Sequence, residues 1–331
     1  MKLIRLVFYL ALMAATAAAT DVKGSEKEQF VNRLNQLATD GPLTTTSPPI
    51  RLHARVAFSE SGKAPLLGSF LLVRLSTNLW REQIVLSGYE EARTVTDGKL
   101  WMRRTADFEP ANIRLLREAL NFPSQLRIRK GEKIHRVRIV NGDSCGEIGP
   151  GRPYNREICV NEHGQVASVR WMAASARFED KLQLSYSTTE RGMFPTRLSL
   201  LDMGRRGLEI EVLEFARPAP EEQEHMLPPP ASEPWDWCAE PTFEREMRLP
   251  GLDSIFTSLP TSSDSFRLRV YALLDVDGQF KNVTATEVPQ GLVNVDYLVK
   301  RLKSAKLSPA TCDGKPVKYE WLFSLNFNRA R

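Results

Sequence analysis

The four cysteines are the side chains whose chemistry is easiest to predict. Cys145 and Cys159 flank a Gly/Pro-rich loop at residues 146–154, and cysteines across such a loop bond readily. Cys238 and Cys312 would form a second disulfide, and each bond would stabilise the fold by about 2–4 kcal/mol through loop closure. The two other pairings stay open. Zinc is disfavoured, because the sequence has no Cys-x-x-Cys pair.

The sequence contains no motif of a common enzyme class. Gly-x-Ser-x-Gly, His-Glu-x-x-His, a phosphate loop and a dinucleotide fingerprint are all absent. The four histidines, His53, His135, His163 and His225, have no acid at ligand or triad spacing. The sequence therefore predicts a protein that is not an enzyme, with no catalytic residues, no cofactor and no metal. An extracytoplasmic hydrolase with an unrecognised site is a competing hypothesis.

The segment from Asp275 to Gly278 resembles the start of a calcium loop. An EF-hand needs glycine at its sixth position and glutamate at its twelfth, and neither fits here. Asp-Gly instead favours a tight hairpin turn, whose central residues have positive φ. The segment is therefore predicted to join two antiparallel strands.

Tryptophans suggest where an apolar ligand would bind. Trp80, Trp101 and Trp171 fall in predicted strands, where such residues fill a core or line a concave face. They are the predicted apolar-ligand face. The alternative is ordinary core packing.

The N-terminus has the layout of a secretory signal peptide at residues 1–19. A basic start precedes an apolar run from Leu6 to Ala15, and cleavage is predicted near Ala19. Removing this segment lowers the net charge from +5 to about +3. So small an excess of positive charge does not indicate a protein that binds nucleic acid. We expect a periplasmic protein. The alternative is an uncleaved anchor, which would add a membrane contact.

The densest basic stretch, residues 127–138, alternates charged and apolar residues at the period of a strand. This pattern favours the solvated face of a hairpin. A patch for phosphate or lipid headgroups is the alternative.

Alternating strands dominate residues 25–216 and predict an α+β domain with a long curved antiparallel sheet. Helices are expected from the Ser25 cap to about Leu37 and at residues 110–120. Strands are expected at residues 51–58, 68–75, 80–86, 91–96, 99–104, 133–140, 166–178, 182–186, 197–201 and 208–215. A proline-rich segment, residues 217–240, is predicted to be a semi-rigid linker to a second domain, residues 241–331.

The second domain is predicted to be a small ββαβ module. Strands at residues 267–274 and 283–288 would form the hairpin, and a final strand would run from about Tyr319 to Phe327. Between them Val295, Leu298, Val299 and Leu302 form one apolar stripe of a helix.

This module resembles the C-terminal domain of TonB, which couples inner-membrane energy to outer-membrane transporters. The resemblance depends on the order strand, Asp-x-Asp-Gly, strand and helix, followed by Pro309-Ala310 and then Asp313-Gly314-Lys315-Pro316-Val317. The lead-in at Leu249-Pro250-Gly251 departs from the family pattern. The resemblance implies that a transporter peptide adds to the last strand. The predicted edge residues are Lys318, Glu320, Leu322 and Ser324.

Residues 25–216 resemble the LolA-like half-barrel of periplasmic lipoprotein carriers. The similarity is carried by element order and by Gly68-Ser69-Phe70, Leu79-Trp80-Arg81-Glu82 and Asp97-Gly98-Lys99-Leu100-Trp101. It implies a concave face that binds acyl chains or a partner protein.

Together these resemblances predict a non-enzymatic binding protein that assists transport. Its partners would be an outer-membrane transporter peptide or another envelope protein, and a lipid or lipoprotein. A membrane-anchored energy transducer of the TonB type is the alternative.

Overall fold

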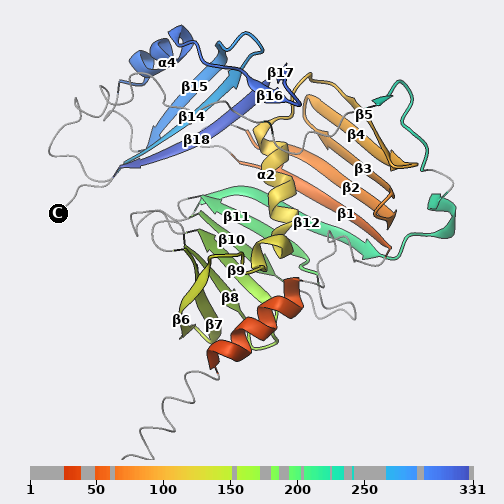
Figure 1. The fold of residues 1–331 in the computed structure, drawn as a ribbon, viewed down its shortest axis with the longest axis vertical. Coiled ribbons are helices and arrows are strands. Elements are labelled where there is room, and N and C mark those ends of the chain that lie inside the picture. Colours follow the sequence, from red (N-terminus) through yellow and green to blue (C-terminus); the bar gives the residue numbers. More distant parts are fainter. Residues whose placement is uncertain are drawn as a thin grey trace, which may run out of the picture. The chain divides into compact units, whose positions relative to one another are not determined.

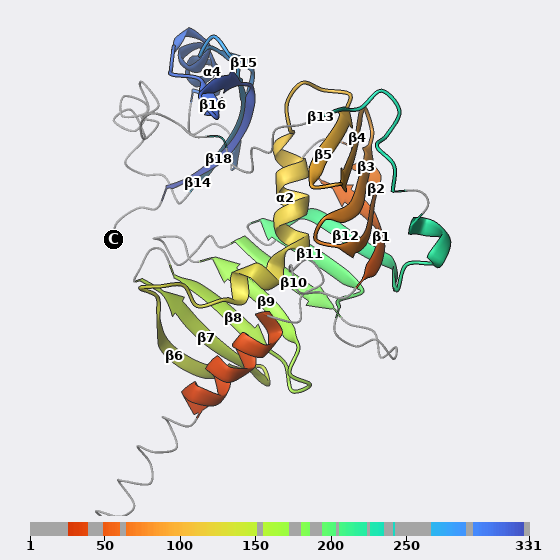
Figure 2. The ribbon, with the colours of Figure 1, turned by 45° about the vertical axis from the view of Figure 1, so that its right-hand side comes forward.

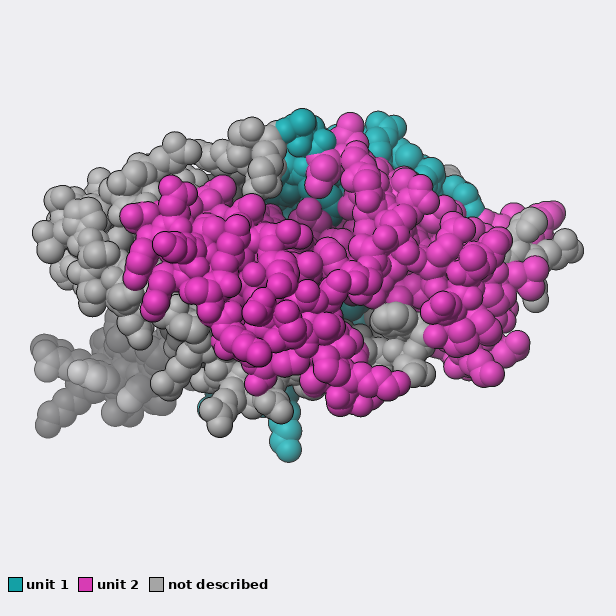
Figure 3. Space-filling model, turned by 90° about the horizontal axis from the view of Figure 1, so that it is seen from above, with its two compact units in different colours: residues 1–65, 119–217 teal, residues 66–118, 218–331 magenta. Residues whose placement is uncertain are grey.

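A computed structural model describes residues 26–38, 49–59, 64–150, 155–171, 180–185, 194–202, 205–223, 226–234, 241, 266–288 and 294–327 (Figures 1 and 2). The predicted signal peptide lies outside these ranges. The chain divides into two compact units, residues 1–65 with 119–217 and residues 66–118 with 218–331 (Figure 3). Each unit therefore combines two separate stretches of sequence.

The first unit contains an antiparallel array of strands, in the order β1-β12-β11-β10-β9-β8-β7-β6. The strands are β1 (Ile50–Phe58), β6 (Lys133–Val140), β7 (Asp143–Gly149), β8 (Arg156–Val160), β9 (Val166–Trp171), β10 (Asp180–Ser185), β11 (Arg197–Asp202) and β12 (Arg205–Ala216). Burial alternates along β1, where Leu52, Ala54 and Val56 face the core. A short 3₁₀ helix, η1 (Phe122–Leu126), precedes β6.

The N-terminal helix, residues 26–38, packs on this array through one stripe. Phe30, Leu34 and Ala38 lie four residues apart and are buried. The ring of Phe30 lies over Gly146 of β7, where a Cβ atom would come within 2.2 Å of the ring. Only glycine leaves room for the helix at this point.

The second unit begins with the meander β2 (Leu66–Ser76), β3 (Leu79–Leu86), β4 (Tyr89–Thr96) and β5 (Lys99–Arg104). Asp97 and Gly98 have φ values of 51° and 71°, as the predicted hairpin turn requires. Helix α2 (Ala111–Leu120) follows.

The proline-rich segment is bound to this meander. Its short 3₁₀ helix is η2 (Pro220–Gln223), and its strand β13 (Glu233–Pro234) pairs with Met102 and Trp101 of β5. Met226 is only 5% exposed. The described part of the segment is thus packed against protein as well as connecting two regions.

The C-terminal part of this unit has the predicted ββαβ order. Its elements are β14 (Phe266–Leu274), β15 (Phe280–Val288), α4 (Val295–Ser304), β16 (Ala310–Cys312), β17 (Lys315–Val317) and β18 (Tyr319–Phe327). The sheet order is β15-β14-β18, and β16 pairs with β17. Leu298 and Leu302 of α4 pack into a buried cluster with Leu268, Val270 and Phe280.

The loop predicted between Cys145 and Cys159 is partly wrong. Its first four residues, 146–149, belong to strand β7, which pairs antiparallel with β8 and places Cys145 directly opposite Cys159. Glycine and proline in this stretch indicated a loop, but Gly146 is needed within β7 by the helix above it. The strand predicted at residues 166–178 is described only to Trp171.

Candidate binding surfaces

Helix α2 is held over β3 and β4 by a cluster of charged side chains. Arg117 stands on the same stripe as the buried Ile113 and Leu116. Its Nε donates to Glu82 Oε1 at 3.0 Å, and its Nη2 lies 2.5 Å from Glu91 Oε1. A third carboxylate, Glu109, contacts Nη1.

The same carboxylates bind a second arginine. Arg93 Nε lies 2.5 Å from Glu91 Oε1, and its Nη2 lies 3.6 Å from Glu109. The Tyr89 hydroxyl donates to the other oxygen of Glu91. The Glu91 side chain is 1% exposed and that of Arg117 is 19% exposed. We name Glu82, Tyr89, Glu91, Arg93, Glu109 and Arg117 the α2 clamp.

The clamp shifts the pKa values of Tyr89, Glu91 and Arg117 away from titration near neutral pH. Burial acts to raise the pKa of Glu91, but the charges of Arg93 and Arg117 outweigh it, so this pKa is lowered. Burial acts to lower the pKa of Arg117, but Glu82, Glu91 and Glu109 raise it overall. Burial, with Glu91 beside it, raises the pKa of Tyr89. The charges of Glu91 and Arg117 therefore persist, and the cluster acts as an attachment and not as a proton donor.

The predicted tryptophans do not share one surface. Trp80 pairs with Val95, and Trp101 pairs with Thr94, the preceding residue of β4. Because neighbouring residues of a strand point to opposite faces, Trp80 and Trp101 lie on opposite faces of the meander. Trp80 lies two residues from Glu82 and shares the face that α2 covers. Trp171 belongs to β9, in the first unit.

The predicted peptide edge, on β18, meets the start of α2. The carboxylate of Glu320 accepts from the backbone nitrogen of Ala111 at 2.6 Å. Arg114 donates to the carbonyl oxygen of Glu320, and its guanidinium lies 4.2 Å from the centre of the Tyr319 ring. The Glu320 carbonyl therefore points away from β14, toward the outer edge of this three-stranded sheet.

Backbone direction alternates along β18, so Leu322 and Ser324 present their amide groups to the same outer edge as Glu320. Lys318, just before the strand, lies 2.5 Å from Asp107. The hydrogen bond between them lowers the pKa of Asp107 and raises that of Lys318. The four predicted edge residues thus follow one edge, and its first part contacts residues near α2. The side chain of Ser324 is outside the described set.

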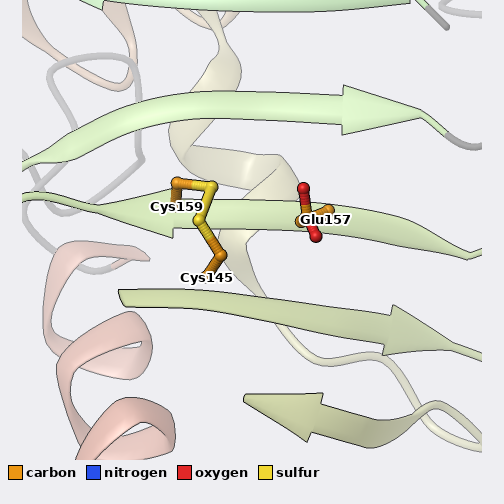
Figure 4. A group of neighbouring side chains, drawn as sticks. All are labelled: Cys145, Glu157 and Cys159. Atoms are coloured by element: carbon orange, nitrogen blue, oxygen red, sulfur yellow. A yellow bond between two sulfur atoms is a disulfide. The ribbon is translucent and has the colours of Figure 1, made fainter. Parts of the chain in front are cut away.

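The predicted bond between Cys145 and Cys159 is present, and Figure 4 shows it beside Glu157. These three residues are close enough to hold an ion. Disulfide sulfurs are not thiolate ligands, and Glu157 already pairs with Arg138 at 2.6 Å, so the group is structural. Cys312 is also disulfide-bonded, whereas Cys238 lies outside the described residues.

Sequence reasoning missed the α2 clamp. One signal was available, since Ile113, Leu116, Arg117 and Leu120 fall at i, i+3, i+4 and i+7. An arginine on an apolar stripe needs buried carboxylate partners. Nothing in the local sequence shows which glutamates provide them.

No protein-family model matches the sequence, and no curated protein matches it. A solved LolA superfamily protein from Nitrosomonas europaea is 13% identical, covering 59% of this chain and 96% of its own, with a TM-score of 0.38. A domain described as an outer-membrane lipoprotein-sorting protein, from Vibrio parahaemolyticus, is 9% identical, covering 60% and 97%, with a TM-score of 0.37. MucB is 12% identical, covering 84% and 96%, with a TM-score of 0.32.

The first two of these structures are of the kind that the N-terminal resemblance predicts. None of the three is described as a TonB protein, so the C-terminal resemblance stays a prediction. Among the described residues, no helix is long and apolar enough to cross a membrane.

Proposed function

We propose that this chain is a periplasmic, non-enzymatic binding protein. Its C-terminal ββαβ module binds an extended peptide of an outer-membrane transporter or another envelope protein along β18. Its carrier-like sheet binds an apolar ligand or a lipoprotein.

The outer edge of β18 carries the peptide part of this proposal. The Glu320 carbonyl at that edge accepts a hydrogen bond from the Arg114 side chain, and no described strand pairs there. A backbone group that accepts from a side chain can accept from the amide of an added strand in the same direction. A peptide that extends along the first part of β18 would compete with Arg114.

The position of Trp80 supports the apolar-ligand part. Trp80 is half-buried on the face that α2 covers, two residues from Glu82. A ligand that enters between α2 and this face would contact both the indole ring and the α2 clamp.

The peptide part is tested with synthetic peptides from the N-terminal segments of the host's outer-membrane transporters. Leu322→Pro deletes one outward amide of β18 without touching the ladder to β14, because proline is tolerated on the open side of an edge strand. We expect at least one peptide to bind the wild type and to bind Leu322→Pro about tenfold more weakly. The matched control is the same peptide with alternate amides N-methylated, which should not bind. Equal binding by wild type and variant would overturn the edge as the site.

Intact mass of the protein from fractionated envelopes tests location. A soluble form that starts near Thr20 is expected. A full-length form retained in the inner membrane would contradict it and support the anchored energy transducer.

A further inference from the structure

The strand β6 is the outer strand of the first unit, and no described strand pairs with its far side. A two-residue turn, Asn141-Gly142, joins it to β7, with φ values of 52° and 91°. Such a turn makes Val140 and Asp143 a hydrogen-bonded pair, and bonding then alternates along the ladder. Val137 and Ile139 therefore direct their backbone N–H and C=O groups outward.

A groove lies beside this open edge. Its volume is about 540 Å³, and it is lined on one side by the N-terminal helix and on the other by β6 and its neighbours. Apolar lining comes from Phe30, Val137, Ile139 and Val160, and polar lining includes Arg33 and Asn161. The Ile139 side chain is 71% exposed. Such exposure is unusual for a large apolar residue on an edge strand, because it favours pairing with another chain.

The opposite face of β6 is basic. Residues 127–140 contain six lysines and arginines and one glutamate, Glu132, which pairs with Arg156. Arg136 lies 3.3 Å from Glu147 on this face. Arg138 shares the carboxylate of Glu157 with Arg170, at 2.6 and 3.4 Å. Three arginines thus meet two carboxylates, which leaves an excess of one positive charge there. Lys133 is exposed.

We propose that β6 binds an extended segment of a partner protein as an added strand, with acidic and apolar side chains in alternation. In an added strand, residues beside Val137 and Ile139 would place apolar side chains in the groove, and the residues between them would face Arg136 and Arg138. A second copy of this chain is a poor occupant, since two β6 strands would bring like charges together. This site is separate from the edge of β18 and does not depend on the function proposed for it.

The probe is a peptide of about eight residues in which glutamate and valine alternate, with its ends blocked. Binding to the mature protein is measured by fluorescence anisotropy, and exchange of the Val137 and Ile139 amides is followed by NMR. We expect saturable binding and slowed exchange at both amides. A copy with lysine in place of glutamate should not bind, and a copy with alternate amides N-methylated should bind at least about tenfold more weakly.

Two variants at Ile139 and one control variant locate the site. Ile139→Pro removes one outward amide and the exposed side chain while leaving the β6–β7 ladder intact, and should weaken binding about tenfold or more. Leu213→Pro would break a central strand, so the matched control is Leu213→Ser, which alters a 46% exposed leucine on β12 and should bind normally. Ile139→Ser retains the amide, so its affinity for the peptide should fall between those of Ile139→Pro and Leu213→Ser.

Three results would overturn the proposal. The first is no binding by the acidic peptide at millimolar concentration, or equal binding by its lysine copy. The second is self-association of the protein that Ile139→Pro abolishes, which would make a second copy the occupant. The third is displacement of the peptide by phosphatidylglycerol vesicles but not by phosphatidylcholine vesicles, which would make the basic face a lipid surface.

Discussion

Two helices of the second unit are attached to their sheets in opposite ways. Helix α4 packs through Leu298 and Leu302, each 1% exposed, on an apolar cluster. Helix α2 also buries Ile113 and Leu116, but it adds the α2 clamp, in which Arg117 meets three carboxylates. Apolar packing has no preferred direction, whereas ion pairs hold only in one geometry.

The difference between the two attachments affects how precisely each helix is positioned on its sheet. Buried ion pairs add little net stability over apolar packing, because desolvation opposes the attraction, yet losing one partner is costly. The α2 clamp therefore fixes where α2 lies more than it stabilises the fold. Four predictions, from the largest effect to the smallest, test this contrast.

Arg117→Met should destabilise the protein by about 3–5 kcal/mol, because Glu82, Glu91 and Glu109 would lose their shared partner. Urea denaturation measures the effect. The control is Arg103→Met, at an exposed position of β5, where the free energy of unfolding should change by no more than about 0.5 kcal/mol. A cost below about 1 kcal/mol at Arg117 would remove the contrast between the helices.

Leu298→Ala should cost about 3 kcal/mol, through lost burial and a cavity under α4. The cost should be the same in low and high salt, because no charge is involved. Tyr297→Ala, at a side chain that is 44% exposed, is the matched control and should change stability little. A strong salt dependence for Leu298→Ala would contradict an apolar attachment.

Glu91→Gln should cost about 1–3 kcal/mol at neutral pH, as charge-assisted bonds to Arg93 and Arg117 are lost. The pKa of Glu91 is lower in the folded protein than its ordinary value of 4.5. The ionised Glu91 carboxylate therefore stabilises the folded protein fully above pH 4.5, and this contribution is lost as the pH falls below that value. Unfolding free energies across this range should fall less steeply for Glu91→Gln than for the wild type. Parallel curves would show that Glu91 does not contribute to acid lability.

Lys318→Ala should have the smallest effect, since its pair with Asp107 is exposed to solvent. We expect no measurable change in the urea midpoint. Hydrogen exchange at the Glu320 and Leu322 amides should quicken if the pair restrains the start of β18. Asp107→Ala should give the same result, and the double variant should add nothing further.

Periodicity in the sequence predicted the elements well. Alternation located β1 and β5, and the stripe through Leu298 and Leu302 located α4, because each pattern reflects one buried face. The α+β class is confirmed. Strands β7 and β8 were not predicted, because glycine and proline indicated a loop. Gly146 is in fact part of β7, where the Phe30 ring leaves no room for a Cβ atom.

The binding surfaces were harder to predict than the elements. The α2 clamp joins residues from β3, β4 and α2, and the pairing of Glu82 with Arg117 across 35 residues leaves no local pattern. The tryptophan prediction ignored strand register, and register determines that Trp80 and Trp101 face opposite sides. The sequence of β6 was recognisable as a basic alternating stretch. Whether a described strand pairs with its outer edge depends on the strand order of the whole sheet, which the stretch itself does not show.

The ladder between β1 and β12 has a consequence for how the chain folds. Arg51 pairs with Glu214, 163 residues later, while most other strand pairs join neighbours in sequence. Closing so long a loop is entropically expensive, so the hairpins should form first and the β1–β12 ladder late. A chain released N-terminus first would expose β1 until β12 follows. In that interval the edge of β1 that pairs with β12 is open to a chaperone or to aggregation.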